Sequence, residues 1–296
     1  MNIQWYPGHM TKTMRMLQEN ISLVDIVIEL LDARIPYSSK NPDIDKLAQN
    51  KKRIIILNKA DLADESANAA WTSHFAERGI EVVSVNSTTG KGLDAVTAAA
   101  KALMQEKLER LRAKGRIFVP TRAMIVGVPN VGKSTLINRY AGSSMAKTAD
   151  KPGVTRSKQW IKVRKDFELL DTPGILWPKF DDQFVGISLA ATGAVNDDIL
   201  DTQTLACELI KRLAGLYPDA LTKRYGVEPL TEGAEPFDVL TQIAAARGFL
   251  QKGGAMDTER AAIILIDEFR GGRLGRISLE RPDTPKTMDA EKPKQA

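Results

Sequence analysis

The chain has 296 residues, 43% of them hydrophobic and 27% charged, which is enough for one large domain and a smaller second one. Its longest apolar runs are far shorter than a membrane span, and its amino terminus lacks a signal-peptide profile. The single cysteine, Cys207, excludes an intramolecular disulfide, so we expect a globular cytoplasmic protein with no membrane partner.

The net charge of +5 is unevenly distributed along the chain. Residues 116–180 carry 12 Lys and Arg against 4 Asp and Glu, whereas residues 181–296 carry 14 against 19. A basic excess attracts nucleic acid, but it is equally typical of a solvated surface, and charge alone leaves both interpretations open. Much of the excess lies at Arg156, Lys158, Lys162, Arg164 and Lys165.

The first 23 residues predict a Pro-Gly turn followed by a short amphipathic helix. Met14, Leu17 and Ile21 recur there at helical spacing. His9 lies at the start of this helix, where an isolated histidine is more often an ordinary helix-start residue than a functional one.

Apolar runs alternating with helical patterns predict an α/β fold over the next hundred residues. Buried strands are expected at 25–31, 53–57 and 80–85, and helices at 64–78 and from residue 93 to about 114. This alternation indicates right-handed parallel βαβ units with helices on both faces of one sheet. Charged residues such as Asp32 follow the first strand, at the sheet edge where open α/β folds place ligand loops.

The second of these strands runs directly into Asn58-Lys59-Ala60-Asp61. A carboxylate at Asp61 can accept hydrogen bonds from the ring N–H and the exocyclic amine of guanine, whereas adenine offers neither donor on that edge. Asn58 and Lys59 would brace the loop, with the lysine stem along the base plane. Standing alone, the motif would be read as an exposed turn.

A strand at 122–126 and a helix at 134–140 are joined by Gly127-Val128-Pro129-Asn130-Val131-Gly132-Lys133-Ser134-Thr135. This is the phosphate-binding P-loop pattern in the strand, loop and helix context that it requires. Glycines let backbone N–H groups turn inward around a phosphate at the positive end of the helix. Lys133 supplies a mobile charge to the outer phosphates, and Ser134 a hydroxyl to Mg²⁺. The alternative is a glycine-rich turn without a ligand.

A polar loop over 143–158 follows the P-loop helix, and we expect it to order on a ligand. Two short strands, at 159–163 and 167–170, then form a hairpin that ends in Asp171-Thr172-Pro173-Gly174. Asp171 fits a contact to the water shell of Mg²⁺, and the N–H of Gly174 can reach a γ-phosphate.

The pattern becomes mainly helical from about residue 184. Helical periodicity covers residues 184–192, 202–214, 236–251 and 258–270, with Pro and Gly breaks between them. We therefore expect a nucleotide-binding domain over 1–178, a helical domain over 179–280 and a disordered tail over 281–296.

These residues together carry a family resemblance. The motifs GVPNVGKST, PGVT, DTPG, NKAD and NST are those of GTPases, in an order that begins with the guanine-specificity motif. With WYPGHM, DARIPYSS and LLDTPGILWPKF as well, residues 1 to about 280 closely resemble the ribosome biogenesis GTPase A family of circularly permuted GTPases. The resemblance implies an α/β P-loop GTPase fold with a mainly parallel sheet and a smaller C-terminal helical domain that contacts ribosomal RNA. It also implies an assembly factor for the large ribosomal subunit precursor, hydrolysing GTP slowly alone and faster on the particle. We expect a monomer.

On the matching positions, the resemblance implies that GTP or GDP contacts Asn58, Lys59, Asp61, Asn86, Ser87, Pro129, Asn130, Val131, Gly132, Lys133, Ser134, Thr135 and Gly174. It implies that Mg²⁺ is held by Ser134, Thr155 and Asp171, that K⁺ is held by Asn130, and that His9, Lys133 and Thr155 are catalytic.

Two positions depart from the common GTPase pattern. Asn86-Ser87 stands where many GTPases have Ser-Ala, and Ile175 replaces the water-orienting Gln, so the resemblance points to His9 for that role. Permutation also makes residues 174–179 the tether to the helical domain. Loss of a γ-phosphate contact at this tether can therefore reposition the helical domain.

Two alternatives come from other functional classes. Kinases share P-loops, although the Asn-Lys-x-Asp motif argues against a kinase. A nucleotide-gated RNA-binding module with incidental hydrolysis would carry the same motifs, and turnover measured with and without large-subunit particles separates it from a true enzyme.

Overall fold

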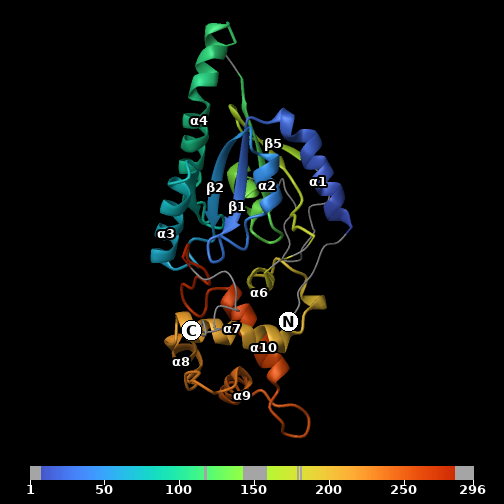
Figure 1. The fold of residues 1–296 in the computed structure, drawn as a ribbon, viewed down its shortest axis with the longest axis vertical. Coiled ribbons are helices and arrows are strands. Elements are labelled where there is room, and N and C mark those ends of the chain that lie inside the picture. Colours follow the sequence, from blue (N-terminus) through green and yellow to red (C-terminus); the bar gives the residue numbers. More distant parts are fainter. Residues whose placement is uncertain (1–7, 117–118, 143–158, 179, 181, 284–296) are drawn as a thin grey trace, which may run out of the picture.

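The computed structural model describes residues 8–116, 119–142, 159–178, 180 and 182–283, without the side chains of His9 and Gln159. The described chain forms an elongated molecule with a sheet domain at one end and a helical domain at the other (Figure 1). The helical domain lies below the edge at which the parallel strands end, so it faces the loops that follow those strands.

The sheet has six strands in the order β3-β2-β1-β4-β6-β5. All neighbours are parallel except β5, which forms an antiparallel hairpin with β6. The strands are β1 (Ile26–Asp32), β2 (Lys52–Asn58), β3 (Glu81–Val85), β4 (Thr121–Gly127), β5 (Gln159–Arg164) and β6 (Phe167–Asp171). The chain fills β1 to β3 in one direction and then continues on the other side of β1 with β4. The carboxyl ends of β1 and β4 therefore flank the topological switch point, where open α/β sheets bind ligands.

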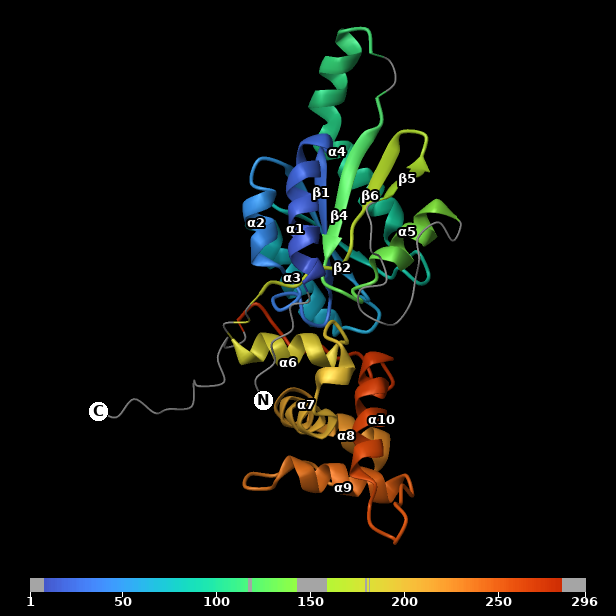
Figure 2. The same ribbon diagram turned by 90° about the vertical axis from the view of Figure 1, so that its right-hand side faces the viewer.

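Helices cover both faces of the sheet (Figure 2). They are α1 (His9–Asn20), α2 (Pro42–Leu47), α3 (Glu65–Ala76), α4 (Leu93–Ala113) and α5 (Lys133–Ala141). Successive side chains of β2 point to opposite faces of the sheet, so this one strand contributes to two apolar clusters. Ile54 and Ile56 join the larger core, whereas Ile55 and Leu57 pack with Trp71 of α3 in a separate apolar cluster. The expected α/β fold with a mainly parallel sheet is thus confirmed.

The helical domain consists of α6 (Gln183–Ala191), α7 (Thr202–Leu216), α8 (Asp219–Tyr225), α9 (Pro236–Ala246) and α10 (Thr258–Arg270). The apolar periodicity predicts that α9 continues to residue 251. This prediction is wrong, because the helix ends at Ala246 and Gly248 takes a positive φ of 66°. Helices α2 and α8 were not predicted. Among the described residues, no helix combines the length and apolar character needed to cross a bilayer.

After α10 the chain turns back and packs on the sheet domain. We call residues 271–283 the return segment. The N–H of Leu279 donates to the carbonyl of Arg34 at 2.9 Å, and the N–H of Ile277 donates to the carbonyl of Leu62 at 2.9 Å. Its most deeply buried acid is Glu280, 2% exposed, whose carboxylate accepts from the N–H groups of Tyr37 and Ser38 at 2.8 and 3.1 Å and from the Ser38 hydroxyl.

The buried Glu280 makes the stability of the protein depend on pH. Burial raises the pKa of its carboxyl to about 7, even though the hydrogen bonds from Ser38 oppose this. Because the folded-state pKa lies above the unfolded one, the stabilising effect is complete at low pH and is lost as pH rises through 7. We expect the wild type to lose about 1 kcal/mol of stability relative to Glu280→Gln between pH 6 and 8. Denaturant unfolding at the two pH values measures this, and equal slopes for both proteins would contradict it.

Candidate nucleotide-binding site

The loop between β4 and α5 has the backbone geometry of a phosphate cradle. Gly132 has a φ of 101°, and a Cβ atom there would lie 2.4 Å from the side-chain nitrogen of Asn58. Asn130 has a positive φ of 56°, which asparagine tolerates better than most residues. The α5 helix begins directly afterwards at Lys133, so its free N–H groups and positive dipole end face the loop. Ser134 and Thr135 lie in its first turn and are half-buried.

Lys133 is buried, and its ammonium is held by the loop itself. It donates to the carbonyl of Gly127 at 3.0 Å and to that of Val128 at 2.8 Å. Burial lowers the pKa of Lys133 to about 8, although the carboxylate of Asp171 opposes this shift. A cation anchored by neutral carbonyls can turn toward an anion without breaking an existing ion pair.

Asp171 ends β6 with its carboxylate buried and incompletely satisfied. The side chain is 2% exposed, and its Oδ1 has no hydrogen-bond partner among the described atoms. Burial raises the pKa of Asp171 to about 6, and Lys133 offsets part of that increase. An orphaned carboxylate oxygen beside a buried lysine fits a site for hydrated Mg²⁺, because hard divalent cations prefer oxygen ligands.

The segment after Asp171 packs against the phosphate loop. A Cβ atom on Gly174 would lie 2.7 Å from Cα of Pro129 and 3.2 Å from Nζ of Lys133, so only glycine fits here. The N–H of the next residue, Ile175, donates to the carbonyl of Gly127 at 3.2 Å. The Ile175 side chain is buried in the core and has no polar atom, so it cannot orient a water molecule.

Asn58 ties the Asn-Lys-x-Asp loop to the phosphate loop. Its side-chain nitrogen donates to the carbonyl of Val131 at 2.7 Å, and its oxygen accepts from the N–H and the hydroxyl of Ser87 at 3.1 and 2.7 Å. Three loops that follow β2, β3 and β4 thus meet at one amide. Ser87 uses both of its donors on Asn58. The side-chain oxygen of Asn86 accepts from Thr88 and Thr89 and shapes the turn.

The two remaining residues of the motif differ in exposure. Lys59 is half-buried, takes a positive φ of 58°, and places its ammonium 3.0 Å from the carboxylate of Asp32. Asp61 is exposed and available to a ligand.

Some predicted residues lie outside the described part of the structure. They are the polar loop at 143–158, which includes Thr155, Arg156 and Lys158, the side chain of His9, and residues 284–296 of the predicted tail. The backbone of His9 begins α1, and its neighbour Met10 is fully buried, with its sulfur 3.4 Å from the N–H of Leu176. The start of α1 therefore lies beside the segment that follows Gly174.

Two contacts to the helical domain were not predicted from the sequence. The side-chain nitrogen of Asn130 donates to the carbonyl of Gly193, which follows α6, at 2.9 Å. Arg34, directly after β1, donates to carbonyls at the end of α10. Neither Gly193 nor the α10 carbonyls carry a side-chain signal that could have revealed them.

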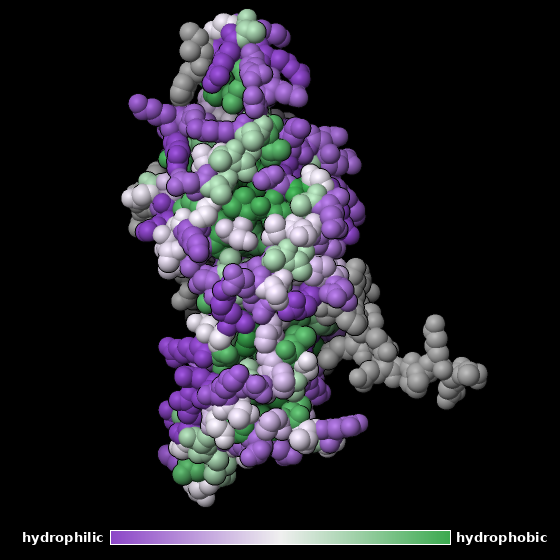
Figure 3. All heavy atoms as spheres, turned by 90° about the vertical axis from the view of Figure 1, so that its left-hand side faces the viewer, coloured by the Kyte–Doolittle hydropathy of each residue, from purple (hydrophilic) through white to green (hydrophobic). Residues whose placement is uncertain are grey.

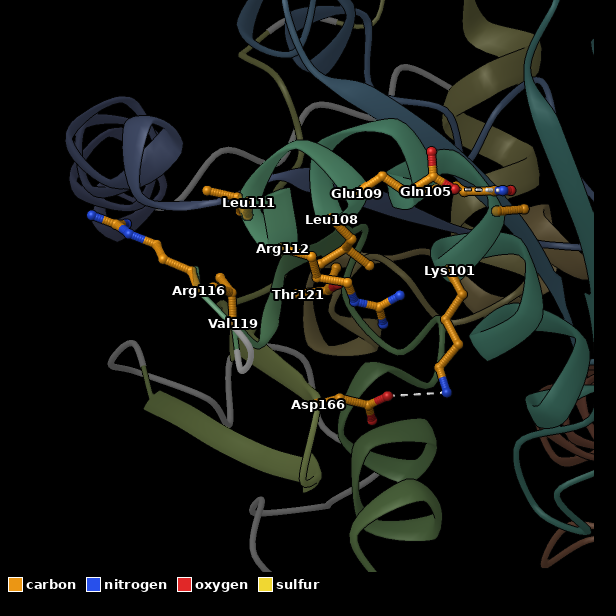
Figure 4. Close-up of a pocket in the computed structure, with 11 residues that line it drawn as sticks. Lys101, Gln105, Leu108, Glu109, Leu111, Arg112, Arg116, Val119, Thr121 and Asp166 are labelled. Carbon is orange, nitrogen blue, oxygen red and sulfur yellow. Dashed lines mark hydrogen bonds and ion pairs between the residues drawn. The ribbon is translucent and has the colours of Figure 1, made fainter. Parts of the chain in front are cut away.

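A cavity of about 580 Å³ lies at the opposite end of the sheet, between α4 and the loop that joins β5 to β6 (Figure 4). Its lining includes Arg112, Arg116 and the ion pair of Lys101 with Asp166 at 3.0 Å. None of the residues of the nucleotide-binding motifs lines it, so we do not assign the nucleotide to this cavity.

Three features define a P-loop GTPase. A P-loop follows a central strand, an Asn-Lys-x-Asp loop is braced against it through Asn58, and an Asp-Thr-Pro-Gly segment packs on the P-loop. The Asn-Lys-x-Asp strand precedes the P-loop in the chain, which makes the order a circular permutation. Residues 122–212 match the family model described as a 50S ribosome-binding GTPase.

Curated relatives extend this match along the chain. The ribosome biogenesis GTPase A of Bacillus cereus is 47% identical over 284 residues, covering 96% of this chain and 95% of that protein. The protein of the same name from Thermotoga maritima is 33% identical, covering 95% of each. A solved structure of YlqF from T. maritima with GNP bound has a TM-score of 0.63 at 29% identity, covering 92% of this chain and 99% of that one. The chain belongs to the ribosome biogenesis GTPase A family.

Proposed function

We propose that this GTPase binds GTP with Mg²⁺ between the phosphate loop, Gly174 and the Asn-Lys-x-Asp loop, and uses the nucleotide state to gate binding to a large ribosomal subunit precursor. The observation that supports nucleotide binding is the set of hydrogen bonds made by the side chain of Asn58. These bonds fix the Asn-Lys-x-Asp loop relative to the phosphate loop. Lys133 serves the outer phosphates, while Ser134, Thr155 and Asp171 hold Mg²⁺ and its water shell.

Asp61 is assigned to base recognition. We expect Asp61→Asn to weaken GTP binding at least tenfold and to gain xanthosine triphosphate, whose carbonyl at the position of the guanine amine accepts from an amide. Competition titrations with a fluorescent guanine nucleotide measure both affinities. Normal GTP binding by the variant would show that the assignment is wrong.

Hydrolysis is proposed to be slow in the free protein and faster on the particle. Ile175 supplies no polar atom for the attacking water. We assign the orientation of the attacking water to His9, because the contact of Met10 with Leu176 places the start of α1 beside this segment. We also propose that Asn130 holds a K⁺ ion, as the family resemblance implies. The ratio of turnover rates in K⁺ and in Na⁺ tests for this ion. Hydrolysis no faster on the particle would favour the nucleotide-gated module with incidental turnover.

The proposed partner is the ribosomal RNA of the large-subunit precursor. The names of the matched family model and of the relatives support it, and a factor of this kind would act as a monomer in the cytoplasm. Two basic surfaces could meet RNA phosphates. One is the protruding end of α4 and the turn after it, where much of the surface is hydrophilic (Figure 3). The other is the exposed side of the β5 hairpin. Their basic residues are Lys107, Arg110, Arg112, Lys114 and Arg116 on the first, and Lys162, Arg164 and Lys165 on the second.

Contacts to RNA phosphates make association depend on salt, because each neutralised phosphate releases counterions. We expect the affinity for large-subunit particles to fall steeply as KCl rises from 50 to 200 mM, by about 10³-fold if six phosphates are contacted. Replacing Lys162 and Lys165 together by Ala should flatten the slope. Association that does not change with salt would show that these residues form an ordinary solvated surface.

A further inference from the structure

Arg34 lies between the guanine-recognition loop and the helical domain. It follows β1, and its side chain is 1% exposed, one of the largest fully buried side chains in the protein. Figure 1 shows that α10 ends below the carboxyl edge of β1 and β2. Arg34 lies two residues after the end of β1.

On one side, Arg34 fixes Asp32 through a forked ion pair. Its Nε donates to Oδ1 at 2.9 Å, its Nη2 to Oδ2 at 2.8 Å, and its backbone N–H to Oδ1 at 3.1 Å. Two parallel donors hold a carboxylate in a single orientation, which a point charge cannot do. Burial alone would raise the pKa of Asp32, but Arg34 and Lys59 outweigh it and hold the carboxyl well below its ordinary range.

Asp32 in turn holds Lys59. The lysine ammonium lies 3.0 Å from Oδ2, and the backbone of Lys59 keeps the left-handed conformation that non-glycine residues avoid. Such a conformation persists only where the surroundings fix it. The Lys59 stem is the part of the motif assigned to the face of the base, so its position depends on the orientation of Asp32.

On the other side, Arg34 binds the end of α10. Its Nη1 donates to the carbonyls of Phe269 and Arg270 at 3.3 and 3.2 Å, and the guanidinium lies 5.2 Å from the centre of the Phe269 ring. The last carbonyls of a helix carry its negative dipole end and favour a cation. The same guanidinium therefore serves two domains.

We propose that Arg34 is a positioning residue for guanine recognition, which acts through Asp32 and Lys59 and makes nucleotide affinity depend on the seating of α10 against the sheet domain. The inference rests on the guanine site proposed above. Arg34 itself touches no nucleotide. Without the Arg34 guanidinium, Asp32 keeps the hydrogen bond from the backbone N–H of residue 34 but loses the fork that fixes its orientation. Lys59 then loses its fixed partner, and the surface that supports the base relaxes.

A double-mutant cycle on GDP affinity tests this. We expect Arg34→Met to raise the Kd for a fluorescent GDP analogue about tenfold, mainly through faster dissociation. In a Lys59→Met background, which is weakened already, the same change should add little. An effect of Arg34→Met that is equally large in both backgrounds would show simple structural damage and overturn the proposal, as would unchanged affinity in the single variant. If Arg34→Met does not fold, Arg34→Lys serves, because it keeps the charge and loses the fork.

Arg212→Met is the matched control. Arg212 is also a buried arginine that donates to a backbone carbonyl, that of Phe184 at 3.1 Å, and lies over a phenylalanine ring at 4.1 Å. It belongs to the helical domain and contacts no nucleotide loop, so GDP affinity should stay at the wild-type value. Equal weakening by both arginine variants would overturn the proposal. If Lys59→Met and Asp61→Asn leave GDP binding intact, the guanine site is wrong, whereas normal binding by Arg34→Met alone refutes only this inference.

Amide hydrogen exchange provides a readout of the coupling itself. By linkage, a nucleotide that is bound more tightly when α10 is seated must also stabilise that seating. We expect GDP to slow exchange over residues 269–280 in the wild type, and this protection to be lost in Arg34→Met. Protection of equal size in both proteins would contradict the coupling.

Discussion

Lys133→Ala is expected to abolish productive binding of GTP with Mg²⁺, raising the Kd about 100-fold or more. The estimate follows from the loss of charge-assisted contacts to two phosphates, each contributing about 1.5–3 kcal/mol. In the free protein, the variant loses the donation of Lys133 to Gly127 and Val128 and the cation that offsets the buried charge of Asp171. Isothermal titration with GTP and MgCl₂ measures the effect.

Lys101→Ala is the control for that experiment. Lys101 is exposed, pairs with Asp166 and lies at the opposite end of the sheet. Its removal should leave nucleotide affinity unchanged. Binding of GTP by Lys133→Ala with an affinity near wild type would mean that the phosphates lie elsewhere.

His9→Ala is expected to leave nucleotide affinity near wild type and to lower particle-stimulated hydrolysis by about 10²-fold, as for a lost water-positioning group. Three observations support the choice. Ile175 is buried and apolar, Met10 contacts Leu176, and the second histidine, His74, packs against Trp71 and Phe75 on α3. Steady-state phosphate release with saturating large-subunit particles measures the effect.

The matched variant is His74→Ala, which should reduce stability by removing ring contacts and leave stimulated turnover per folded molecule unchanged. If His9→Ala hydrolyses GTP on the particle as fast as the wild type, the role passes to ribosomal RNA or to the bound cation.

The nucleotide loops could be predicted because each is a contiguous stretch whose chemistry is set by its own residues. Gly132 must take a positive φ, and Asp61 must follow a buried strand, and both requirements are visible in the sequence. The β strands were predicted to within one residue at each end for the same reason, since apolar runs end where polar loops begin.

Contacts between distant polar groups could not be predicted. Arg34 and the carbonyl of Phe269 are 235 residues apart, and a backbone acceptor leaves no residue-type signal. The braced amide of Asn58 reaches Val131 across 73 residues in the same way. Helix α9 was overextended because Phe249 and Leu250 continue the apolar periodicity beyond the glycine that ends the helix. Helix α2 was missed because it has only six residues, although Asn41 caps it and Pro42 begins it.

Co-sedimentation tests whether the nucleotide state gates binding to the large-subunit precursor. Purified precursor particles would be pelleted with the protein in GDP or in a non-hydrolysable GTP analogue, at one salt concentration. We expect the protein to pellet with the analogue, and several-fold more of it to stay in the supernatant with GDP. We also expect Asp61→Asn to pellet only with the xanthosine analogue. Equal pelleting of the wild type in both nucleotides, or with none, would contradict nucleotide gating.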